Sequence, residues 1–412
     1  MSSTIIESIY ARKILDSRGR WTIEVDVYTC GGFGSAAAPS GASTGEHEVV
    51  SFPDGDVEKS LIELEEVVIP ELEFWDATNQ DLIDTLLKEI DGTDDFSNIG
   101  GNAATAVSMA CAKAAANSCG MPLYLYLGGS MASYALPFPL GNIIGGGAHA
   151  KGTDIQEFLA LPIGAEDIES ALATNIAVHS RVKDKLKAAG KLAGRGDEGA
   201  WVADLENEEA LKMLKSSCEE VTGETGVDVR PCLDVAASEM WDEKKGKYIF
   251  KRDGRELSRD EHIEYIQSLI DEYGLYYVED PLDENDFDGF AALRKNALIC
   301  GDDLYTTNVT RIEEGIKRGS TNAVLIKVNQ IGTLTDTYHA VKAAVDSGQT
   351  PVMSHRSGET TDETIAHLAV GFGCPVIKTG VVGGERIAKL NELLRIAEEL
   401  GPESARMAKP PL

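Results

Sequence analysis

The sequence has no surplus of basic residues, since 38 Lys and Arg stand against 68 Asp and Glu and give a net charge of −30. A protein that binds nucleic acid or an anionic membrane surface needs cations to neutralise phosphates, so we expect neither partner. A small anionic substrate stays compatible with this charge, because a few local cations or bound metal ions outweigh a distant field.

The sequence also lacks long apolar runs and paired cysteines. The apolar stretch 103–116 is interrupted by Thr, Ser and Lys and is too short to cross a bilayer. The first residues show no basic head followed by an apolar stretch, so we expect no export segment. Seven scattered cysteines contain no CxxC pair, which argues against a disulfide framework and a thiolate zinc site. We therefore expect a cytoplasmic protein with reduced, mostly buried cysteines.

Residues 1–132 are predicted to form an N-terminal α+β capping domain. Two alternating stretches, 3–11 and 22–28, predict strands, and apolar periodicity predicts helices at 57–68, 79–90 and 102–116. The small residues of 34–46 show no periodicity and predict a mobile loop. We place the domain boundary in LGGSMAS, 127–133.

Residues 133–412 are predicted to form a barrel, because short apolar runs alternate with helical segments eight times. The predicted strands lie near 137–144, 155–161, 229–234, 275–279, 297–301, 322–326, 350–354 and 374–377. The predicted helices lie near 167–190, 206–221, 259–272, 286–294, 309–318, 332–346, 360–371 and 384–399. Eight such units favour a closed (β/α)8 barrel. An open doubly wound sheet is the alternative, but no GxGxxG follows the first strand.

An ionisable residue stands at the end of each of six late strand runs: Asp234, Glu279, Asp302, Lys327, His355 and Lys378. The intervals from Glu279 onward are 23, 25, 28 and 23 residues, about one strand–helix unit each. In a barrel this phasing places all six at the C-terminal rim, where active sites are built.

Three of these rim residues, Asp234, Glu279 and Asp302, are acids that repel one another unless a cation lies between them. Oxygen ligands suit a hard ion, and Mg²⁺ fits best. The alternative is that each acid pairs with a lysine or caps a helix. Lys327 or Lys378, packed beside other cations, could lose a proton near neutral pH and act as a general base, or could pair with a carboxylate.

Further segments place polar groups in settings that suggest chemistry. His355-Arg356-Ser357 combines an imidazole, a planar cation and a hydroxyl, which suits an oxyanion such as phosphate. Glu157 lies inside the apolar run IQEFLAL, where an unpaired carboxylate is costly. The acids of GDEG, 196–199, are flanked by glycines that let the backbone approach a ligand, although GDEG is also an ordinary turn. His149, in the loop GGGAHAKG, is equally compatible with a surface position.

The motifs together closely resemble the enolase (phosphopyruvate hydratase) family over essentially the whole chain. The matching stretches are DSRG (16–19), PSGASTGEHE (39–48), IQEF (155–158), GDEG (196–199), VEDP (278–281), GDDL (301–304), IKVNQIGTL (326–334), SHRSGET (354–360), IKTG (377–380) and AKLNELLRI (388–396). SHRSGET with IKVNQIGTL is the specific combination, whereas GDEG or VEDP alone is not.

The resemblance implies a glycolytic lyase that dehydrates 2-phosphoglycerate reversibly to phosphoenolpyruvate with two Mg²⁺ ions. It implies an α+β cap on an enolase-type barrel whose second strand is antiparallel and is followed by two helices. It also implies that loop 35–46 closes over the site. The roles it implies are first-metal ligands Asp234, Glu279 and Asp302; second-metal ligand Ser40; base Lys327; acid Glu198, assisted by Glu157; His149 near the substrate; phosphate contacts Arg356 and Ser357; His355 lining the site; and Lys378 at the substrate carboxylate.

The sequence departs from the family pattern at Arg20-Trp21, Ala200-Trp201 and Gly383-Gly384, and the loop from 149 to 157 is one residue short. Two rivals follow. A diverged lyase that removes a proton beside another carboxylate would keep Asp234, Glu279, Asp302 and Lys327 but would not need Arg356 and Ser357. A non-catalytic scaffold could lose Lys327 or Glu198. The resemblance further implies a homodimer or a ring of dimers, with Glu24 and Arg395 as an interface pair.

Overall fold

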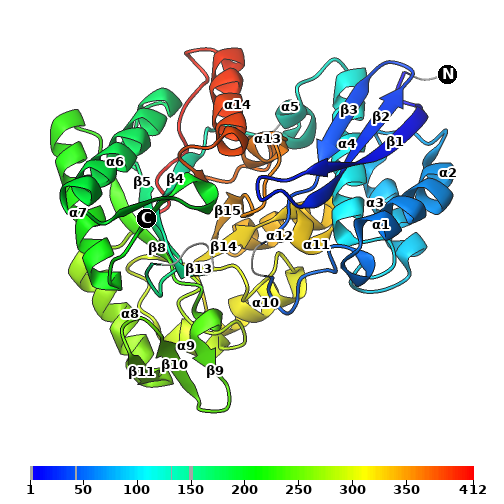
Figure 1. Ribbon diagram of the computed structural model, residues 1–412. Coiled ribbons are helices and arrows are strands. Elements are labelled where there is room, and N and C mark those ends of the chain that lie inside the picture. The colour runs from blue at the N-terminus through cyan, green and yellow to red at the C-terminus, as the bar shows by residue number, and fades with distance from the viewer. Residues whose placement is uncertain (1–2, 42–43, 131, 148–151) are drawn as a thin grey trace.

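The structure of the protein is a computed structural model that describes residues 3–41, 44–130, 132–147 and 152–412. A cap formed by the N-terminal third lies against one side of a barrel formed by the rest of the chain (Figure 1). Within the described part of the chain, no helix combines the length and the apolar composition needed to cross a membrane.

The cap is an antiparallel sheet backed by helices. Its strands, in spatial order, are β1 (Ile6–Leu15), β2 (Trp21–Thr29) and β3 (Phe33–Ala37). Its helices are α1 (Val57–Glu63), a π-helical segment (Leu64–Val68), α2 (Ile69–Leu72), α3 (Gln80–Asp91), α4 (Gly101–Ser118) and α5 (Leu123–Gly128), preceded by a short 3-10 helix (Pro53–Gly55). The two predicted strands and three predicted helices of this region are confirmed.

The prediction of a mobile loop over 34–46 is wrong for its first part, because β3 pairs with β2 in register Val25↔Ala36. Small residues are required there by packing rather than by flexibility. A Cβ on Gly34 would lie 2.2 Å from the carbonyl oxygen of Ala110 in α4, so only glycine allows this approach of sheet and helix. The residues 42–43 of the predicted loop lie outside the described part of the chain.

Eight strands close the barrel: β4 (Phe138–Gly145), β5 (Glu157–Leu161), β8 (Arg230–Asp234), β12 (Tyr277–Glu279), β13 (Leu298–Gly301), β14 (Ala323–Ile326), β15 (Thr350–Ser354) and β16 (Val376–Gly380). Pairing of β16 with β4 completes the ring. β5 runs antiparallel to both of its neighbours, and the two helices α6 (Ile168–Ala188) and α7 (Asn207–Thr225) follow it before β8. The barrel and its atypical start are therefore confirmed, and the open sheet is excluded.

The remaining barrel helices are α8 (Arg259–Tyr273), α9 (Phe287–Ala292), α10 (Val309–Arg318), α11 (Val328–Ile331), α12 (Leu334–Asp346), α13 (Thr364–Gly371) and α14 (Gly384–Leu400), with 3-10 turns at Asp197–Gly199 and Ala237–Met240. The sequence did not predict the added strands β6 (Leu192–Arg195) and β7 (Trp201–Ala203), nor the small sheet β9 (Trp241–Asp242), β10 (Lys247–Phe250) and β11 (Arg255–Ser258). These strands are two to four residues long, which is too short for a periodicity signal.

Candidate active site

The inward-facing side chains of the barrel strands change character at one end. Along the strands the interior is filled by an apolar cluster that includes Cys232, Tyr277, Cys300, Leu325 and Val376. Successive strand residues face opposite sides, so the next inward-facing position lies two residues further on. Those next positions are Asp234, Glu279, Asp302, Lys327 and Lys378. The strand alternation therefore delivers five of the six predicted rim residues to one inner surface.

Glu157 joins the same rim because β5 runs in the opposite direction. It is the first residue of β5 and is paired with Asp234, the last residue of β8. The Nζ of Lys378 lies 2.8 Å from Asp234 Oδ2, 2.7 Å from Glu279 Oε1 and 3.4 Å from Glu157 Oε1. Three buried carboxylates thus surround one ammonium group.

Asp302 is paired with the second lysine of the rim. Its Oδ2 accepts a hydrogen bond from Lys327 Nζ, and its Oδ1 accepts one from Gln330 Nε2 at 2.8 Å. Burial, the largest single influence, lowers the pKa of Lys327, but the charges of Asp302 and Glu279 act against it, and the net shift of this pKa is upward. Loss of the Lys327 proton near neutral pH is therefore not favoured in this arrangement, and each acid of the predicted metal triad has a lysine partner.

Lysines do not balance the charge of the cavity. Among the described residues, its lining includes the carboxyl groups of Glu157, Glu198, Asp234, Asp280, Asp302 and Asp303 and the cations Lys327, Arg356 and Lys378. Burial, reinforced by the charge of Asp234, raises the pKa of Glu279 to about 8. Burial and the charge of Glu198 raise the pKa of Glu157. Oxygen donors in such excess, arranged around an ammonium group, fit a hard divalent cation.

Two of these acids, Asp280 and Asp303, were missed by the sequence reasoning. Together with Asp302 they offer three oxygen atoms within 4.8 Å of one another. Both oxygens of Asp280 accept backbone N–H groups, those of Asp302 and Asp303, at 2.8 Å. Asp280 therefore holds the segment after β13 in place. The available signal was the doubled acid in VEDP and in GDDL.

Glu198 faces the rim from the turn before β7. Its Oε2 accepts a hydrogen bond from Asn142 Nδ2 at 2.9 Å and lies 3.4 Å from His355 Nε2. The glycine after it was expected to let a ligand approach. Instead, a Cβ on Gly199 would lie 2.1 Å from the carbonyl oxygen of Val382, so the glycine accommodates the chain that follows β16.

The segment SHRS after β15 supplies buried polar groups to the cavity. Ser354, His355, Arg356 and Ser357 all line it. The guanidinium of Arg356 donates to Glu48 Oε1 at 3.0 Å and to Asn329 Oδ1 at 2.9 Å, which fixes its position from both domains. Burial lowers the pKa of His355 to about 4, so its imidazole is neutral at neutral pH.

Ser40 lies at the edge of this site rather than in the cavity lining. Its backbone pairs with Gly358 in both directions, and its Oγ donates to Asp16 Oδ2 at 2.9 Å. Its neighbour Gly41 does line the cavity. His149 lies outside the described residues, so its predicted place near the substrate stays a prediction.

The cavity itself is narrow. The cavity volume between its lining side chains is about 30 Å³, far smaller than the 410 Å³ of the apolar cleft between α6 (Ile168–Ala188) and α14 (Gly384–Leu400). Lys327 and Lys378, both paired with carboxylates, are among the residues that line it.

One of the unusual sequence departures has a structural explanation away from the cavity. The Trp201 ring stacks on His179 at 4.6 Å, and its Nε1 donates to the carbonyl oxygen of His179 at 2.8 Å. Trp201 therefore packs β7 against α6. Trp21 is exposed on the cap, with the Lys13 ammonium 5.3 Å from its ring centre.

Comparison with known proteins gives matches along the chain. A family described as "Enolase, N-terminal domain" matches residues 6–127, and one described as "Enolase, C-terminal TIM barrel domain" matches residues 133–409. The enolase of Methanosphaera stadtmanae is 56% identical over 405 residues, covering 96% of this chain and 98% of that protein. The enolase of Methanothermobacter thermautotrophicus is 55% identical over 405 residues, with 96% and 97% covered, and that of Halorubrum lacusprofundi is 50% identical over 402 residues, with 96% and 99% covered.

Proposed function

The chain belongs to the enolase family of carbon–oxygen lyases, and from that premise we propose that it catalyses the magnesium-dependent, reversible dehydration of 2-phosphoglycerate to phosphoenolpyruvate. The observation that carries this proposal is that Lys327, Glu198 and Arg356 all line one cavity. Dehydration next to a carboxylate needs a base for one proton, an acid for the departing hydroxyl, and cationic groups for the anionic substrate.

In the proposed reaction Lys327, which would be released from Asp302 once that carboxylate holds Mg²⁺, removes the proton from C2, and Glu198 protonates the hydroxyl that leaves C3. The two groups come from separate elements, the end of β14 and the turn before β7. The C2 proton is weakly acidic because it lies beside a carboxylate. Glu157, buried and with a raised pKa, supports Glu198 as a partner that holds or passes a proton.

The proposed metal ligands are Asp234, Glu279 and Asp302 for one Mg²⁺ ion and Ser40 for a second that binds with substrate. Bound Mg²⁺ would stabilise the negative charge that develops on the substrate carboxylate. The buried oxygens around Lys378 support this assignment. Lys378, released from these acids, is placed to contact the substrate carboxylate.

Arg356 and Ser357 are the proposed phosphate contacts. Arg356 is 4% exposed and is held by Glu48 and Asn329, so it presents a prepositioned guanidinium to the cavity. This observation favours a phosphorylated substrate over the diverged lyase that acts on another carboxylate. The presence of both Lys327 and Glu198 argues against a non-catalytic scaffold.

Ultraviolet absorbance tests the proposal directly, because phosphoenolpyruvate is conjugated and 2-phosphoglycerate is not. We expect a rise in absorbance that requires Mg²⁺ and is lost in Lys327→Ala. Lys342→Ala, an exchange of an exposed lysine on α12, is the matched control.

No absorbance rise in folded, Mg²⁺-loaded protein would overturn the proposal. Thermal melting with Mg²⁺ and a phosphonate analogue of the intermediate then separates the rivals. Identical melting curves in all conditions would point to a scaffold, and stabilisation by Mg²⁺ alone would point to a lyase with another substrate.

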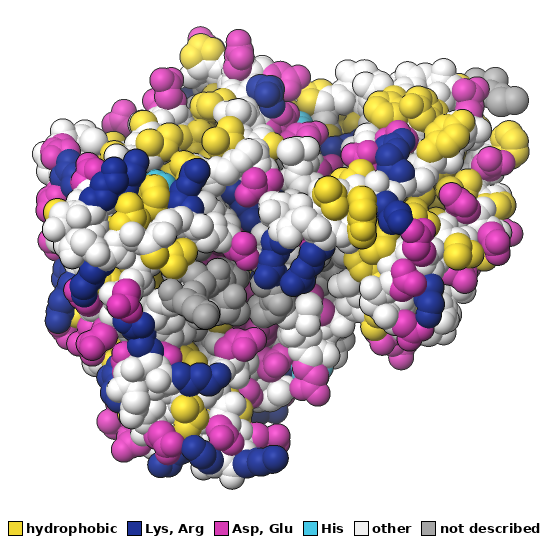
Figure 2. All heavy atoms as spheres, viewed as in Figure 1, with side chains coloured by type: hydrophobic (Ala, Val, Ile, Leu, Met, Phe, Trp, Pro, Cys, Tyr) yellow, Lys and Arg dark blue, Asp and Glu magenta, His cyan; other side chains and the backbone are white. Residues whose placement is uncertain are grey.

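We also propose that the protein is a homodimer, or a ring of dimers, in which a second copy covers two apolar surfaces. One is the outer face of the cap sheet, where the exposed rings of Tyr10, Tyr28 and Phe33 pack in a row. Figure 2 shows hydrophobic side chains over this side of the cap at the upper right and a second group at the upper left, with acidic and basic side chains intermingled around both.

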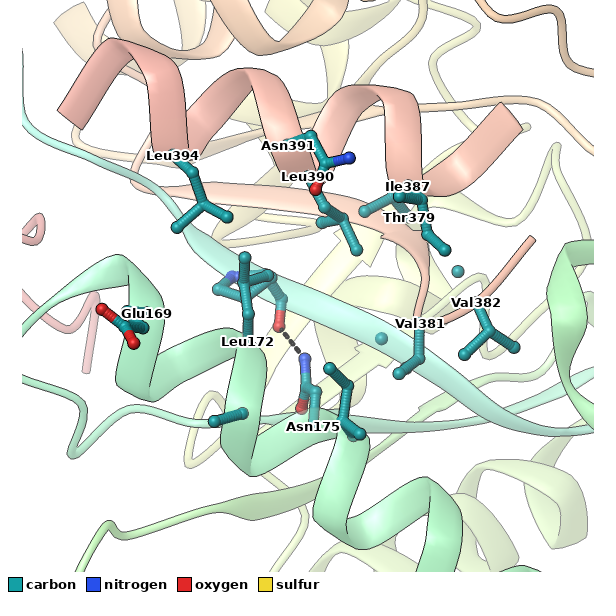
Figure 3. A pocket seen from close by; sticks show the side chains of 15 residues that line it. Glu169, Leu172, Asn175, Thr379, Val381, Val382, Ile387, Leu390, Asn391 and Leu394 are labelled. Atoms are coloured by element: carbon teal, nitrogen blue, oxygen red, sulfur yellow. Dashed lines mark hydrogen bonds between the residues drawn. The ribbon is translucent and has the colours of Figure 1, made fainter. Parts of the chain in front are cut away.

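The second surface is an apolar cleft of about 410 Å³ between α6 and α14. Figure 3 shows Leu390 and Leu394 from α14 and Leu172 from α6 pointing into it. Beside it, the Arg395 side chain on α14 is 65% exposed and pairs with Glu392. We propose that in the dimer it meets Glu24 of a second copy, whose carboxylate pairs with Arg12 within its own cap sheet. Sedimentation of the protein and of Arg395→Glu tests this: we expect a dimer that is weakened in the variant, and a wild-type monomer at micromolar concentration would contradict it.

A further inference from the structure

Helix α14 buries two cations on the face that contacts the segment after β15. Arg386 and Lys389 are three residues apart, and their side chains are 0% and 1% exposed. Lys389 Nζ donates to Glu359 Oε2 at 2.7 Å and to the carbonyl oxygen of Thr360 at 2.6 Å. A buried cation destabilises the fold unless its donors have acceptors. The two acceptors of Lys389 therefore fix its ammonium group in one position.

Arg386 contacts the active-site part of the same segment. Its Nη1 donates to the carbonyl oxygen of Arg356 at 2.5 Å, and its Nη2 donates to that of Ser357 at 2.6 Å. The same Nη1 lies 2.8 Å from His355 Nδ1. One guanidinium therefore holds three consecutive residues of the cavity wall.

The contact with His355 determines where that imidazole carries its proton. A guanidinium has only donors and stays charged, so Nδ1 of His355 has to be the acceptor. A neutral imidazole has one N–H group, and with Nδ1 accepting, that group is Nε2–H. Nε2 lies 3.4 Å from Glu198 Oε2, and the backbone N–H of His355 donates to the carbonyl oxygen of Lys378.

We propose that Arg386 is a positioning residue that fixes His355 as the Nε2–H tautomer, so that the imidazole donates toward Glu198. This inference rests on the proposed function, in which Glu198 protonates the leaving hydroxyl. Asn142 Nδ2 donates to the same oxygen, Oε2, at 2.9 Å. The Asn142 hydrogen bond and the nearby Nε2–H of His355, 3.4 Å from the same oxygen, favour placing the carboxyl proton of Glu198 on Oε1.

Lysine cannot replace arginine here. An ammonium group on a flexible stem donates from a single point, whereas the planar fork of arginine reaches His355 Nδ1 and two carbonyl oxygens at once. In Arg386→Lys we therefore expect His355 to populate both tautomers, which leaves Glu198 with one fixed donor.

Nitrogen NMR of histidine-labelled protein reads the tautomer directly, because protonated and unprotonated ring nitrogens have well-separated shifts. The His355 signals among the seven histidines are identified by their loss in His355→Gln. We expect Nε2–H in the wild type and a mixture in Arg386→Lys. Arg318→Lys, the same exchange on the exposed surface of α10, should leave the His355 signals unchanged.

Kinetics separate positioning from simple damage. Lys327 alone exchanges the C2 proton of 2-phosphoglycerate with deuterium from solvent, whereas product formation also needs Glu198. In Arg386→Lys we expect dehydration to fall about 10- to 100-fold while C2 exchange and KM stay within about threefold.

An Nδ1–H tautomer of His355 in the wild-type spectrum would overturn the inference. Because this measurement uses only the wild type, it tests the tautomer even if the Arg386→Lys variant does not fold. Equal losses of C2 exchange and dehydration would also overturn it, because they indicate general damage to the site. If the wild type shows neither exchange nor product, the proposed function fails, whereas the tautomer assignment is still tested by the spectrum.

Discussion

The body and the end of each barrel strand are built from the same inward-facing positions but serve opposite purposes. In β12, Tyr277 lies within the apolar interior and Glu279, two residues later, lies among buried charges. Leu325 in β14 and Lys327, the residue that directly follows this strand, repeat the pattern. The interior stabilises the fold through apolar burial. At the rim, burial and the charge of Asp234 raise the pKa of Glu279 to about 8, and ionising this buried carboxyl group at neutral pH opposes folding. Inward-facing residues that stabilise the fold and inward-facing residues that line the site are therefore only two positions apart on the same strand.

Glu279→Gln gives the sharpest test of this comparison. The Glu279 oxygens receive hydrogen bonds from Lys378 Nζ at 2.7 Å and from the Tyr277 hydroxyl at 2.6 Å. A glutamine keeps both contacts, because its oxygen accepts from the lysine and the tyrosine hydroxyl can accept from its amide. We expect activity to fall at least about 10³-fold, or about 4 kcal/mol, with metal-free melting unchanged or raised.

Activity assays and melting curves with and without Mg²⁺ check this prediction, and Glu272→Gln on the exposed surface of α8 is the control. A large loss of metal-free stability in Glu279→Gln would show that the rim stabilises the fold and would break the comparison.

Leu298→Ala tests the other half of the comparison. Leu298 begins β13 in the apolar interior and is 1% exposed. Truncation leaves a cavity in a packed core, so we expect the free energy of unfolding to fall by about 2–5 kcal/mol. Denaturant unfolding measures this loss, and kcat of the folded enzyme should stay within about twofold. Leu82→Ala on α3, where the side chain is largely exposed, should cost less than about 1 kcal/mol.

Sequence reasoning predicted the rim well because it depends on local signals. Charged residues such as Asp234 and Lys327 directly follow apolar runs. Because these runs recur at a regular interval, the charged residues lie at the same end of the barrel. It failed at β3, where small residues that allow close packing on α4 gave the same pattern as a mobile loop.

Contacts between distant segments were beyond reach of the same reasoning. Asn142 and Arg386 act on Glu198 and His355 across 56 and 31 residues of chain, and nothing in their neighbourhood marks them. The pairing of Lys378 with three acids could be stated only as an alternative, because spacing predicts which groups meet and not which partner each one chooses.

His262 is a buried titratable group that lies away from the rim. If charges are confined to the rim, this histidine should be neutral in the folded protein. Its ring stacks on Tyr248 at 3.9 Å, its Nε2 donates to the carbonyl oxygen of Pro281, and burial lowers its pKa to about 4. His262 takes up a proton near pH 6.5 in the unfolded chain but only near pH 4 in the folded protein. The contribution of neutral His262 to the free energy of unfolding is therefore complete above about pH 6.5. It is lost as the pH falls toward 4, by up to about 3 kcal/mol.

Chemical unfolding at pH 7 and pH 5 gives the loss of unfolding free energy between these pH values for each protein. The effect of His262 is the difference between the losses of the wild type and the variant. We expect wild-type protein to lose more stability between these pH values than His262→Phe, whose apolar ring keeps the stacking and cannot take up a proton. Equal losses in the two proteins would show that His262 does not couple folding to protonation, and the neutral-only pattern would fail.

Arg18 tests whether residues of the cap take part in the chemistry at the rim, because its side chain extends from the cap to the turn that carries Glu198. Its Nε lies 3.3 Å from Asp197 Oδ2, beside Glu198, and both paired side chains are partly exposed. Such pairs contribute at most about 1 kcal/mol, so Arg18→Ala should lower kcat only about two- to fivefold by loosening the turn that carries Glu198. Asp197→Asn should have a similar effect that does not add to the first, and salt should weaken both. A loss above 100-fold would mean that the cap supplies a group to the chemistry itself, and the division between strand body and strand end would no longer describe where function resides.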